Sequence, residues 1–125
     1  MWTVVKVQGT EVLRDVLDRW RADINAQAPE RVAEVFAEDA IFQGLHPYSV
    51  GRQGVIDYYS GQQPGMTVTY RVLETRRPAE DLVLGFAKAD FAFPEGPTVG
   101  IYLGVLITRA EDAWRIVHYQ ASRLD

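Results

Sequence analysis

Cysteine is absent from this chain of 125 residues, and histidine occurs only at His46 and His118. Disulfides and thiolate chemistry are therefore excluded, and cysteine usage says nothing about the redox compartment. Two histidines 72 positions apart form no recognisable zinc pattern, so we expect no metal. The run Gly51-Arg52-Gln53-Gly54 is too short for a dinucleotide fingerprint, and we expect no cofactor.

Long apolar runs are also missing. No segment approaches the roughly 18 apolar residues of a membrane span, and residues 1–7 lack the basic start and apolar core of a signal peptide. We therefore expect a soluble, cytoplasmic protein with no membrane partner. The formal net charge of −4 argues against a nucleic-acid partner, because binding to phosphates needs a basic surface.

What is present indicates one domain, large enough for a buried core, in which the helices come first. Residues 10–27 are predicted to form a helix because apolar residues recur at three- and four-residue spacing. Thr10 is the expected N-cap, followed by Glu11 in the first turn. The apolar stripe consists of Val12, Leu13, Val16, Leu17, Trp20 and Ile24.

Two shorter helices are predicted next. Pro29 suits the first turn of a helix that ends near Ala37, since proline lacks the donor that would be unpaired there. Residues 40–43 are then extended and residues 44–51 form a loop. A third helix is expected over residues 52–59, and the glycines and proline that follow end it.

The second half of the chain carries strand signals throughout. The turn segments between its strands are short, which favours antiparallel hairpins over crossover connections. Helices followed by an antiparallel meander predict an α+β fold with the helices on one face of the sheet. The segments rich in Val, Ile, Thr and aromatic residues are 66–77, 82–93, 98–109 and 113–122.

The stretch Phe36-Ala37-Glu38-Asp39-Ala40-Ile41-Phe42 marks a passage from the second helix into the first strand. Together with the Gly51-Arg52 step before the third helix and the closing strand Trp114–Gln120 after an acidic turn, it resembles the nuclear-transport-factor-2-like superfamily. Within that superfamily the chain is most similar to small SnoaL-like bacterial proteins, many of them uncharacterised. The resemblance covers residues 10–124. It indicates a fold and no single activity, because this fold hosts isomerases, cyclases, hydrolases and non-catalytic binding domains.

The resemblance implies a cone-shaped domain, in which a strongly bent, mostly antiparallel sheet wraps around the long N-terminal helix. The open end of the cone is expected to be a mostly apolar pocket, and the outer face of the sheet is expected to form a homodimer. The superfamily pattern usually starts at the first helix. We therefore expect residues 1–9 to form an added edge strand or arm of a single domain spanning residues 1–125.

Asp90 is the strongest catalytic candidate, because it lies with Lys88 in an otherwise apolar segment. Strand alternation places both on the face of Leu84 and Phe86. If that face lines the pocket, a carboxyl held against apolar walls can serve as acid, base or hydrogen-bond donor. If it is the outer face, Asp90 and Lys88 face solvent or pair across a dimer. The sequence leaves both alternatives open.

His118 is the second catalytic candidate, since an imidazole suits acid–base chemistry at neutral pH. A histidine packed in a core or interface is the competing interpretation. By alternation His118 shares a face with Ile116 and Gln120, and His46 borders either the pocket mouth or only solvent. The candidate ligand-binding residues are Trp20 as the pocket floor, Tyr58 and Tyr102 as orienting hydroxyls, and Gln120.

Within this fold the steroid-isomerase reaction is disfavoured. The resemblance implies a carboxylate base a few residues beyond the acidic seam, and this position falls on Gly44, between Gln43 and Leu45. Two hypotheses remain. The favoured one is a homodimeric protein that binds a small apolar or aromatic metabolite. The alternative is an isomerase, cyclase or hydrolase that acts on a small hydrophobic substrate through Asp90, with or without His118. This alternative is less favoured because the sequence offers no coherent pair of catalytic groups.

Overall fold

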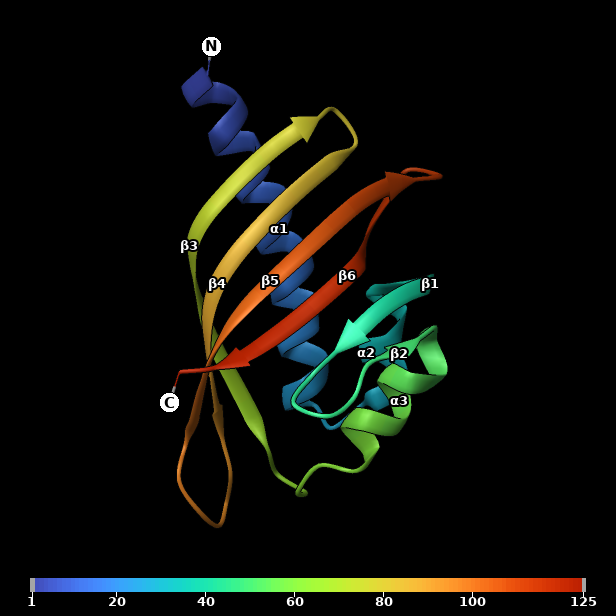
Figure 1. Cartoon of the computed structure of the whole chain (residues 1–125), viewed down its shortest axis with the longest axis vertical. Coiled ribbons are helices and arrows are strands. Elements are labelled where there is room, and N and C mark those ends of the chain that lie inside the picture. The colour runs from blue at the N-terminus through green and yellow to red at the C-terminus, as the bar shows by residue number, and fades with distance from the viewer. Residues whose placement is uncertain (1, 125) are drawn as a thin grey trace.

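A long helix and a six-stranded sheet form the two layers of the molecule (Figure 1). The computed structural model describes residues 2–124, with side chains from residue 9 onward. The predicted α+β class is confirmed. The helices are α1 (Trp2–Asn25), α2 (Pro29–Glu34) and α3 (Arg52–Ser60). The strands are β1 (Phe36–Gln43), β2 (Ser49–Val50), β3 (Thr67–Ala79), β4 (Leu82–Ala92), β5 (Val99–Ala110) and β6 (Ala113–Arg123).

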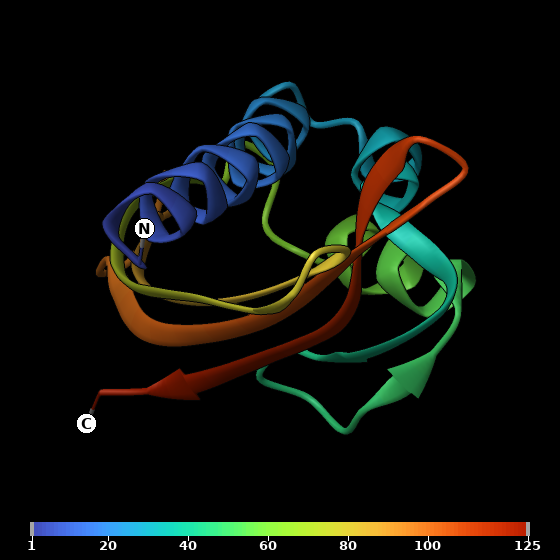
Figure 2. The same cartoon turned by 90° about the horizontal axis from the view of Figure 1, so that it is seen from above.

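The strands lie in the order β2-β1-β6-β5-β4-β3. Only the contact between β1 and β6 is parallel, and all other neighbours are antiparallel. The sheet bends around α1, as Figure 2 shows, so that one face is turned toward this helix. We call that face the inner face and the opposite one the outer face.

The core lies between α1 and the inner face. Leu13, Leu17 and Trp20 of the predicted apolar stripe are each 0% exposed. They pack against inner-face side chains such as Leu103 and Ile116. Burying a large apolar side chain contributes roughly 1.5–3 kcal/mol, so this stripe is the main reason why the sheet closes on the helix.

The N-terminal part of α1 differs from the sequence prediction. The helix begins at Trp2, so no edge strand forms over residues 2–9 and Thr10 is not its N-cap. Gly9 is buried instead of breaking the helix, and a Cβ there would lie 3.3 Å from Thr75 Cγ2. The Thr10 hydroxyl donates to Thr75 Oγ1 at 3.1 Å. Thr10, which was expected to start the helix, therefore lies with Gly9 at the place where α1 crosses β3.

The passage from α2 into β1 is more abrupt than expected. Residues predicted to extend the helix to Ala37 already belong to β1, which begins at Phe36. The chain joins the sheet at once, because the Ile116 N–H donates to the Val35 carbonyl at 2.9 Å and Phe36 pairs with Ile116. The predicted loop 44–51 also contains the short strand β2, which pairs with β1.

A bulge in β6 changes which of its side chains face inward. Ile107 of β5 pairs with Ile116, but Leu106 pairs with His118, so Val117 is an extra residue in β6. Such an insertion shifts every later side chain to the other face. Ile116 is buried before the bulge, and Tyr119 and Ala121 are buried after it. The parity expected to hold through Gln120 therefore ends at Val117.

Candidate functional site

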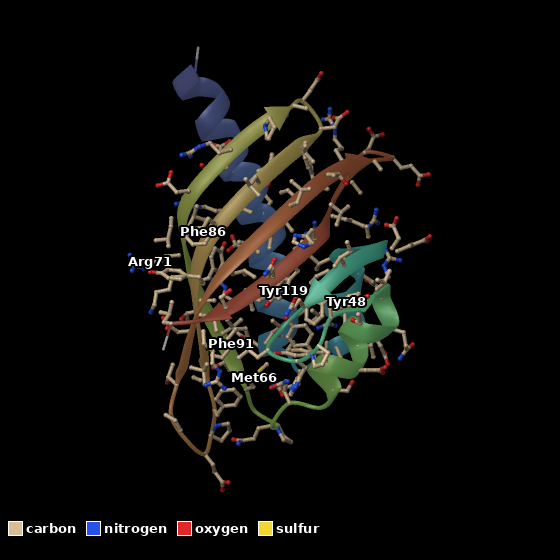
Figure 3. All side chains as sticks on the ribbon, viewed as in Figure 1. Tyr48, Met66, Arg71, Phe86, Phe91 and Tyr119 are labelled. Atoms are coloured by element: carbon tan, nitrogen blue, oxygen red, sulfur yellow. The ribbon has the colours of Figure 1, made fainter. Side chains whose placement is uncertain are left out.

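A cavity of about 200 Å³ lies between the inner face and the loops at the β1 and α3 end of the sheet. Figure 3 shows Tyr119, Phe91 and Met66 gathering there. Met66, Phe91 and Ile101 are buried and supply apolar walls. The residues that line this cone cavity are Leu45, His46, Tyr58, Gln62, Met66, Phe91, Phe93, Val99, Ile101, Tyr119, Ala121 and Arg123.

The floor of the cone cavity rests on a row of buried hydrogen bonds. The Trp20 Nε1–H donates to the Tyr59 hydroxyl at 3.1 Å, and the Tyr59 hydroxyl donates to Tyr119 Oη at 3.4 Å. Indole is only a donor, so the Tyr59 hydroxyl accepts from Trp20 and links it to the Tyr119 hydroxyl, which lines the cavity. Burial raises the pKa of both Tyr59 and Tyr119, so both remain protonated at neutral pH.

Tyr58 forms the wall next to the floor, and its position explains Gly44. A Cβ on Gly44 would lie 2.4 Å from Tyr58 Cζ, so any larger residue would push the Tyr58 ring away. The Tyr58 hydroxyl accepts the Leu45 N–H at 3.2 Å. Burial raises the pKa of Tyr58, although the Leu45 hydrogen bond and the charge of Arg123 act in the opposite direction. A tyrosine thus fills the space where the resemblance would place a carboxylate.

The mouth of the cone cavity carries its remaining polar groups. His46 and Arg123 are exposed there, and the His46 ring lies 5.5 Å from the Tyr58 ring, centroid to centroid. The Gln62 side-chain amide donates to the Tyr58 carbonyl at 3.2 Å. The cavity can therefore enclose a small apolar body while hydrogen-bond donors act at both its floor and its mouth.

A second hollow of about 180 Å³ lies on the other side of Met66 and Gln62. Its glutamine side chains are occupied in holding loops together. Gln27 donates to the Met66 carbonyl at 2.8 Å and accepts the Gly65 N–H at 3.0 Å, while Gln63 bonds the Glu95 backbone in both directions. This hollow therefore has less to offer a ligand than the cone cavity.

Asp90 and Lys88 lie on the outer face of β4. The predicted alternation along β4 is present, and the buried residues Ala87, Ala89 and Phe91 are the ones that face inward. The Lys88 ammonium donates to Asp90 Oδ1 at 2.9 Å. The carboxylate is thus paired with its neighbour and lies outside the cone cavity.

His118 is on the outer face as well, because of the bulge at Val117. It pairs with Leu106 of β5 and Ile41 of β1. Asp90 pairs with Gly100 of β5, six residues from Leu106, which corresponds to about 20 Å along the strand. In the structure, Asp90 and His118 therefore lie neither near each other nor in the cone cavity. Their catalytic role stays a prediction.

The four predicted ligand-binding residues are divided between the two faces. Tyr58 lines the cone cavity, and Trp20 lies beneath its floor through the hydrogen bond to Tyr59. Tyr102 is on the outer face with its ring stacked on Phe86 at 5.2 Å. Gln120 is exposed on that face opposite Gly104.

Sequence reasoning did not single out Ala121 or Arg123 as cavity residues, and it included Tyr119 only among five tyrosines whose hydroxyl could orient a ligand. Strict alternation from Ile116 assigns all three to the other face, and the extra residue Val117 leaves no mark in the hydrophobic pattern. Within the described residues, no group of three or more potential metal ligands lies together. No helix between residues 2 and 124 is long and apolar enough to cross a membrane.

The comparisons with known proteins show what the arrangement resembles. No family model and no curated protein matches the chain. Among solved structures it is similar to a cystatin-like domain of unknown function from Nostoc punctiforme, with a TM-score of 0.80, 17% identity, and coverage of 93% of this chain and 77% of that one. A nuclear transport factor 2 (NTF-2)-like protein of unknown function from Shewanella oneidensis also scores 0.80, with 13% identity and coverages of 90% and 98%.

The chain has the nuclear-transport-factor-2-like fold. A ketosteroid isomerase-like protein from Erwinia carotovora atroseptica shares it too, with a TM-score of 0.80, 13% identity and coverages of 92% and 95%. The fold predicted from the Phe36–Phe42 seam and the closing strand is thereby confirmed. At these identities the nuclear-transport-factor-2-like fold is all that is shared, so function has to be argued from the cone cavity itself.

Proposed function

We propose that the protein binds a small apolar or aromatic molecule in the cone cavity. The observation that carries this proposal is the open-mouthed cavity of about 200 Å³, walled by buried Met66, Phe91 and Ile101. A dry protein cavity of about 150 Å³ accepts benzene. The cone cavity therefore has room for one ring with a short substituent.

The polar groups support binding with a fixed orientation. An apolar pocket with a few placed polar groups is the usual form of a small-molecule site. Here the Tyr119 hydroxyl is held from behind by Tyr59 and Trp20, so it needs little reordering when a ligand enters. Preorganisation of this kind strengthens binding by lowering its entropic cost.

A cavity-filling substitution tests this proposal. Ala121 lines the cavity, and Ala121→Leu would occupy part of the volume that a ligand needs. Ser122→Leu is the matched control, because Ser122 is exposed and pairs with Tyr102 on the outer face. A library of one-ring aromatic compounds is screened by ligand-observed NMR, and the hits are titrated against all three proteins.

We expect Ala121→Leu to weaken the best hits by about tenfold or more and Ser122→Leu to leave them within about twofold. Circular dichroism checks that both variants fold. The proposal is abandoned if no compound binds the wild-type protein, or if the hits bind Ala121→Leu as tightly as they bind the wild type.

A second copy of the chain is the proposed partner of the outer face. Ile41, Leu84, Phe86 and Tyr102 expose 40–45% of their surface there, and exposed apolar patches often mark sites of protein–protein contact. In a two-fold dimer, the same surface patch of both subunits forms the interface. The neighbouring Lys88–Asp90 pair carries both charges, so each can meet its opposite across such an axis.

Sedimentation velocity of a Phe86→Glu variant tests the dimer. A charge at the centre of the interface is expected to raise the dimer dissociation constant by at least about tenfold. Tyr48→Glu is the control, because Tyr48 is 67% exposed in the loop before β2. A wild-type protein that is monomeric at concentrations on the order of 100 μM would exclude this interface.

A further inference from the structure

The cone cavity and the second hollow share part of their walls. Met66 and Gln62 line both spaces. Beside them, Tyr119 lines the cone cavity and Tyr59 lines the second hollow, and the two hydroxyls are hydrogen-bonded at 3.4 Å. The two spaces measure about 200 and 180 Å³. A ligand that reaches through this shared wall therefore has close to double the room of the cone cavity.

Three of these four side chains are fixed by hydrogen bonds. The Trp20 Nε1–H donates to the Tyr59 hydroxyl at 3.1 Å, and this hydroxyl is bonded in turn to Tyr119. The Gln62 side-chain amide donates to the Tyr58 carbonyl at 3.2 Å. Moving any of the three would break a hydrogen bond in a part of the molecule where a replacement partner is hard to find.

Met66 is the movable part of the shared wall. Its N–H donates to the Gln63 carbonyl at 3.1 Å, and its carbonyl accepts the Gln27 side-chain amide at 2.8 Å, so its main chain is held on both sides. The Met66 side chain is unbranched, has three rotatable bonds and adapts its shape to its neighbours. A change of rotamer can therefore open the wall while the backbone stays in place.

The second hollow suits an apolar group better than a polar one. Ile24 and Val32 are its most deeply buried apolar residues besides Met66. The described residues that line it include no charged side chain. Gln27 and Gln63 are already engaged with the loop backbone. An apolar chain therefore finds favourable contacts there, whereas a polar group would find its partners in use.

From these observations we infer that the ligand of the cone cavity is a ring with an unbranched apolar tail, and that the tail passes Met66 into the second hollow. This inference rests on the proposed binding function and adds a second subsite. The ring belongs in the cone cavity, because the aromatic side chains of Phe91 and Tyr119 lie there beside Met66 (Figure 3) and can pack against it. The opening has the width of one side chain, so the tail is unbranched.

The test uses para-methylphenol, para-pentylphenol and its branched isomer para-tert-pentylphenol, whose hydroxyl groups keep them in solution. Each is titrated by calorimetry into the wild-type protein and three variants. Ala28→Leu fills the second hollow, because Ala28 lines this space but not the cone cavity. Ala26→Leu is the matched control, since Ala26 is exposed and lines neither space. Met66→Ile keeps an apolar side chain but makes it stiff at χ1.

We expect para-pentylphenol to bind the wild type at least about tenfold more tightly than para-methylphenol, because each fully buried methylene contributes about fourfold. The branched isomer should bind no more tightly than para-methylphenol. Ala28→Leu and Met66→Ile should each weaken para-pentylphenol about tenfold and leave para-methylphenol within about twofold. Ala26→Leu should change neither. Unchanged para-methylphenol binding also shows that the variants are folded.

Equal binding of para-pentylphenol and para-methylphenol to the wild type would overturn this inference and leave the binding function standing. An equally tight branched isomer would overturn it too, because the gain would then reflect apolar area alone. A pentyl gain that survives in Ala28→Leu or in Met66→Ile would mean that the tail does not pass Met66 into the second hollow. If none of the three probes binds, the ring-with-tail class is wrong, and the wider screen with Ala121→Leu decides the binding function separately.

Discussion

The two faces of the sheet contain similar side chains but have different surroundings. On the inner face of β4, Ala87, Ala89 and Phe91 are buried under α1 and around the cone cavity. On the outer face, Leu84 and Phe86 are as apolar but stay 45% and 40% exposed. Apolar content therefore does not identify the inside of this sheet. The position of α1 identifies the inside of the sheet, because the apolar stripe of this helix covers one face only.

The largest expected difference between the faces concerns Trp20. Its ring is 0% exposed and meets Phe91 and Tyr119 at centroid distances of 6.0 Å. We expect Trp20→Ala to lower the free energy of unfolding by about 3–5 kcal/mol, the cost of a large cavity plus the lost burial. Urea unfolding of dilute, monomeric protein measures it.

Phe86→Ala is the outer-face control for Trp20→Ala. In the monomer this ring stacks on Tyr102 and is 40% exposed, so a loss of about 1 kcal/mol is expected. Equal losses in the two variants would mean that both faces are equally part of the monomer core, and the comparison would fail.

Substituting alanine for one glycine on each face compares the packing of the two faces at the level of one methyl group. A Cβ on Gly85 would lie 2.6 Å from the Leu13 methyl groups, whereas one on Gly104 would have nothing within 4 Å. Gly85→Ala is therefore expected to cost about 1–3 kcal/mol through overpacking, and Gly104→Ala to stay within about 0.5 kcal/mol. Urea unfolding at a concentration where both are monomeric measures the difference, and a neutral Gly85→Ala would show that α1 can move away from β4.

The features of the fold that were predicted from the sequence depend on local periodicity. The stripe from Leu13 to Ile24 and the alternation along β4 are repeats of 3.6 and two residues, which any short window contains. The start of α1 was missed because Thr10 and Glu11 have the chemistry of a helix start. The actual role of Thr10 depends on Thr75, 65 positions away along the chain, and no local pattern shows that contact.

The site was harder to predict than the fold, and β6 shows why. Because of the extra residue Val117, Tyr119 and not His118 lies at the cavity floor, and Ala121 and not Gln120 lies in its wall. Tyr119 and His118 are both amphipathic, so hydropathy does not distinguish the two registers. The identity of the inner face of β4 was equally hidden, because both of its faces are apolar. Gly44 was recognised as an unsuitable base, and the structure adds its steric reason in Tyr58.

Alkaline pH distinguishes the inner face through its buried tyrosines. Burial raises the pKa of Tyr59 and Tyr119 in the folded state above the value near 10 of an unfolded chain. Each therefore contributes stability that is complete below pH 10 and is lost as the pH rises further, because the unfolded state releases the proton first. The free energy of unfolding should fall above about pH 10.

Tyr59→Phe tests this dependence through its slope. Removing one such group should flatten the fall by up to about 1.4 kcal/mol per pH unit, the value for one proton. Urea unfolding between about pH 9 and pH 11.5 gives the slope, which separates ionisation from the constant loss of the Trp20–Tyr59 hydrogen bond. A slope equal to that of the wild type would contradict the assignment of this proton to Tyr59.

The smallest effects are expected from the outer-face candidates Asp90 and His118. The Lys88–Asp90 pair is 27% and 42% exposed, and ion pairs of this kind contribute about 0–1 kcal/mol. Asp90→Asn and His118→Gln should therefore leave affinity for cavity ligands within about twofold, with Ala121→Leu as the variant that does lose it. The enzyme hypothesis makes the opposite prediction for Asp90→Asn, a loss of turnover by about a hundredfold with binding retained. Such a loss would require the substrate to reach the outer face, and Phe86→Glu, which opens that face, would then have to change turnover as well.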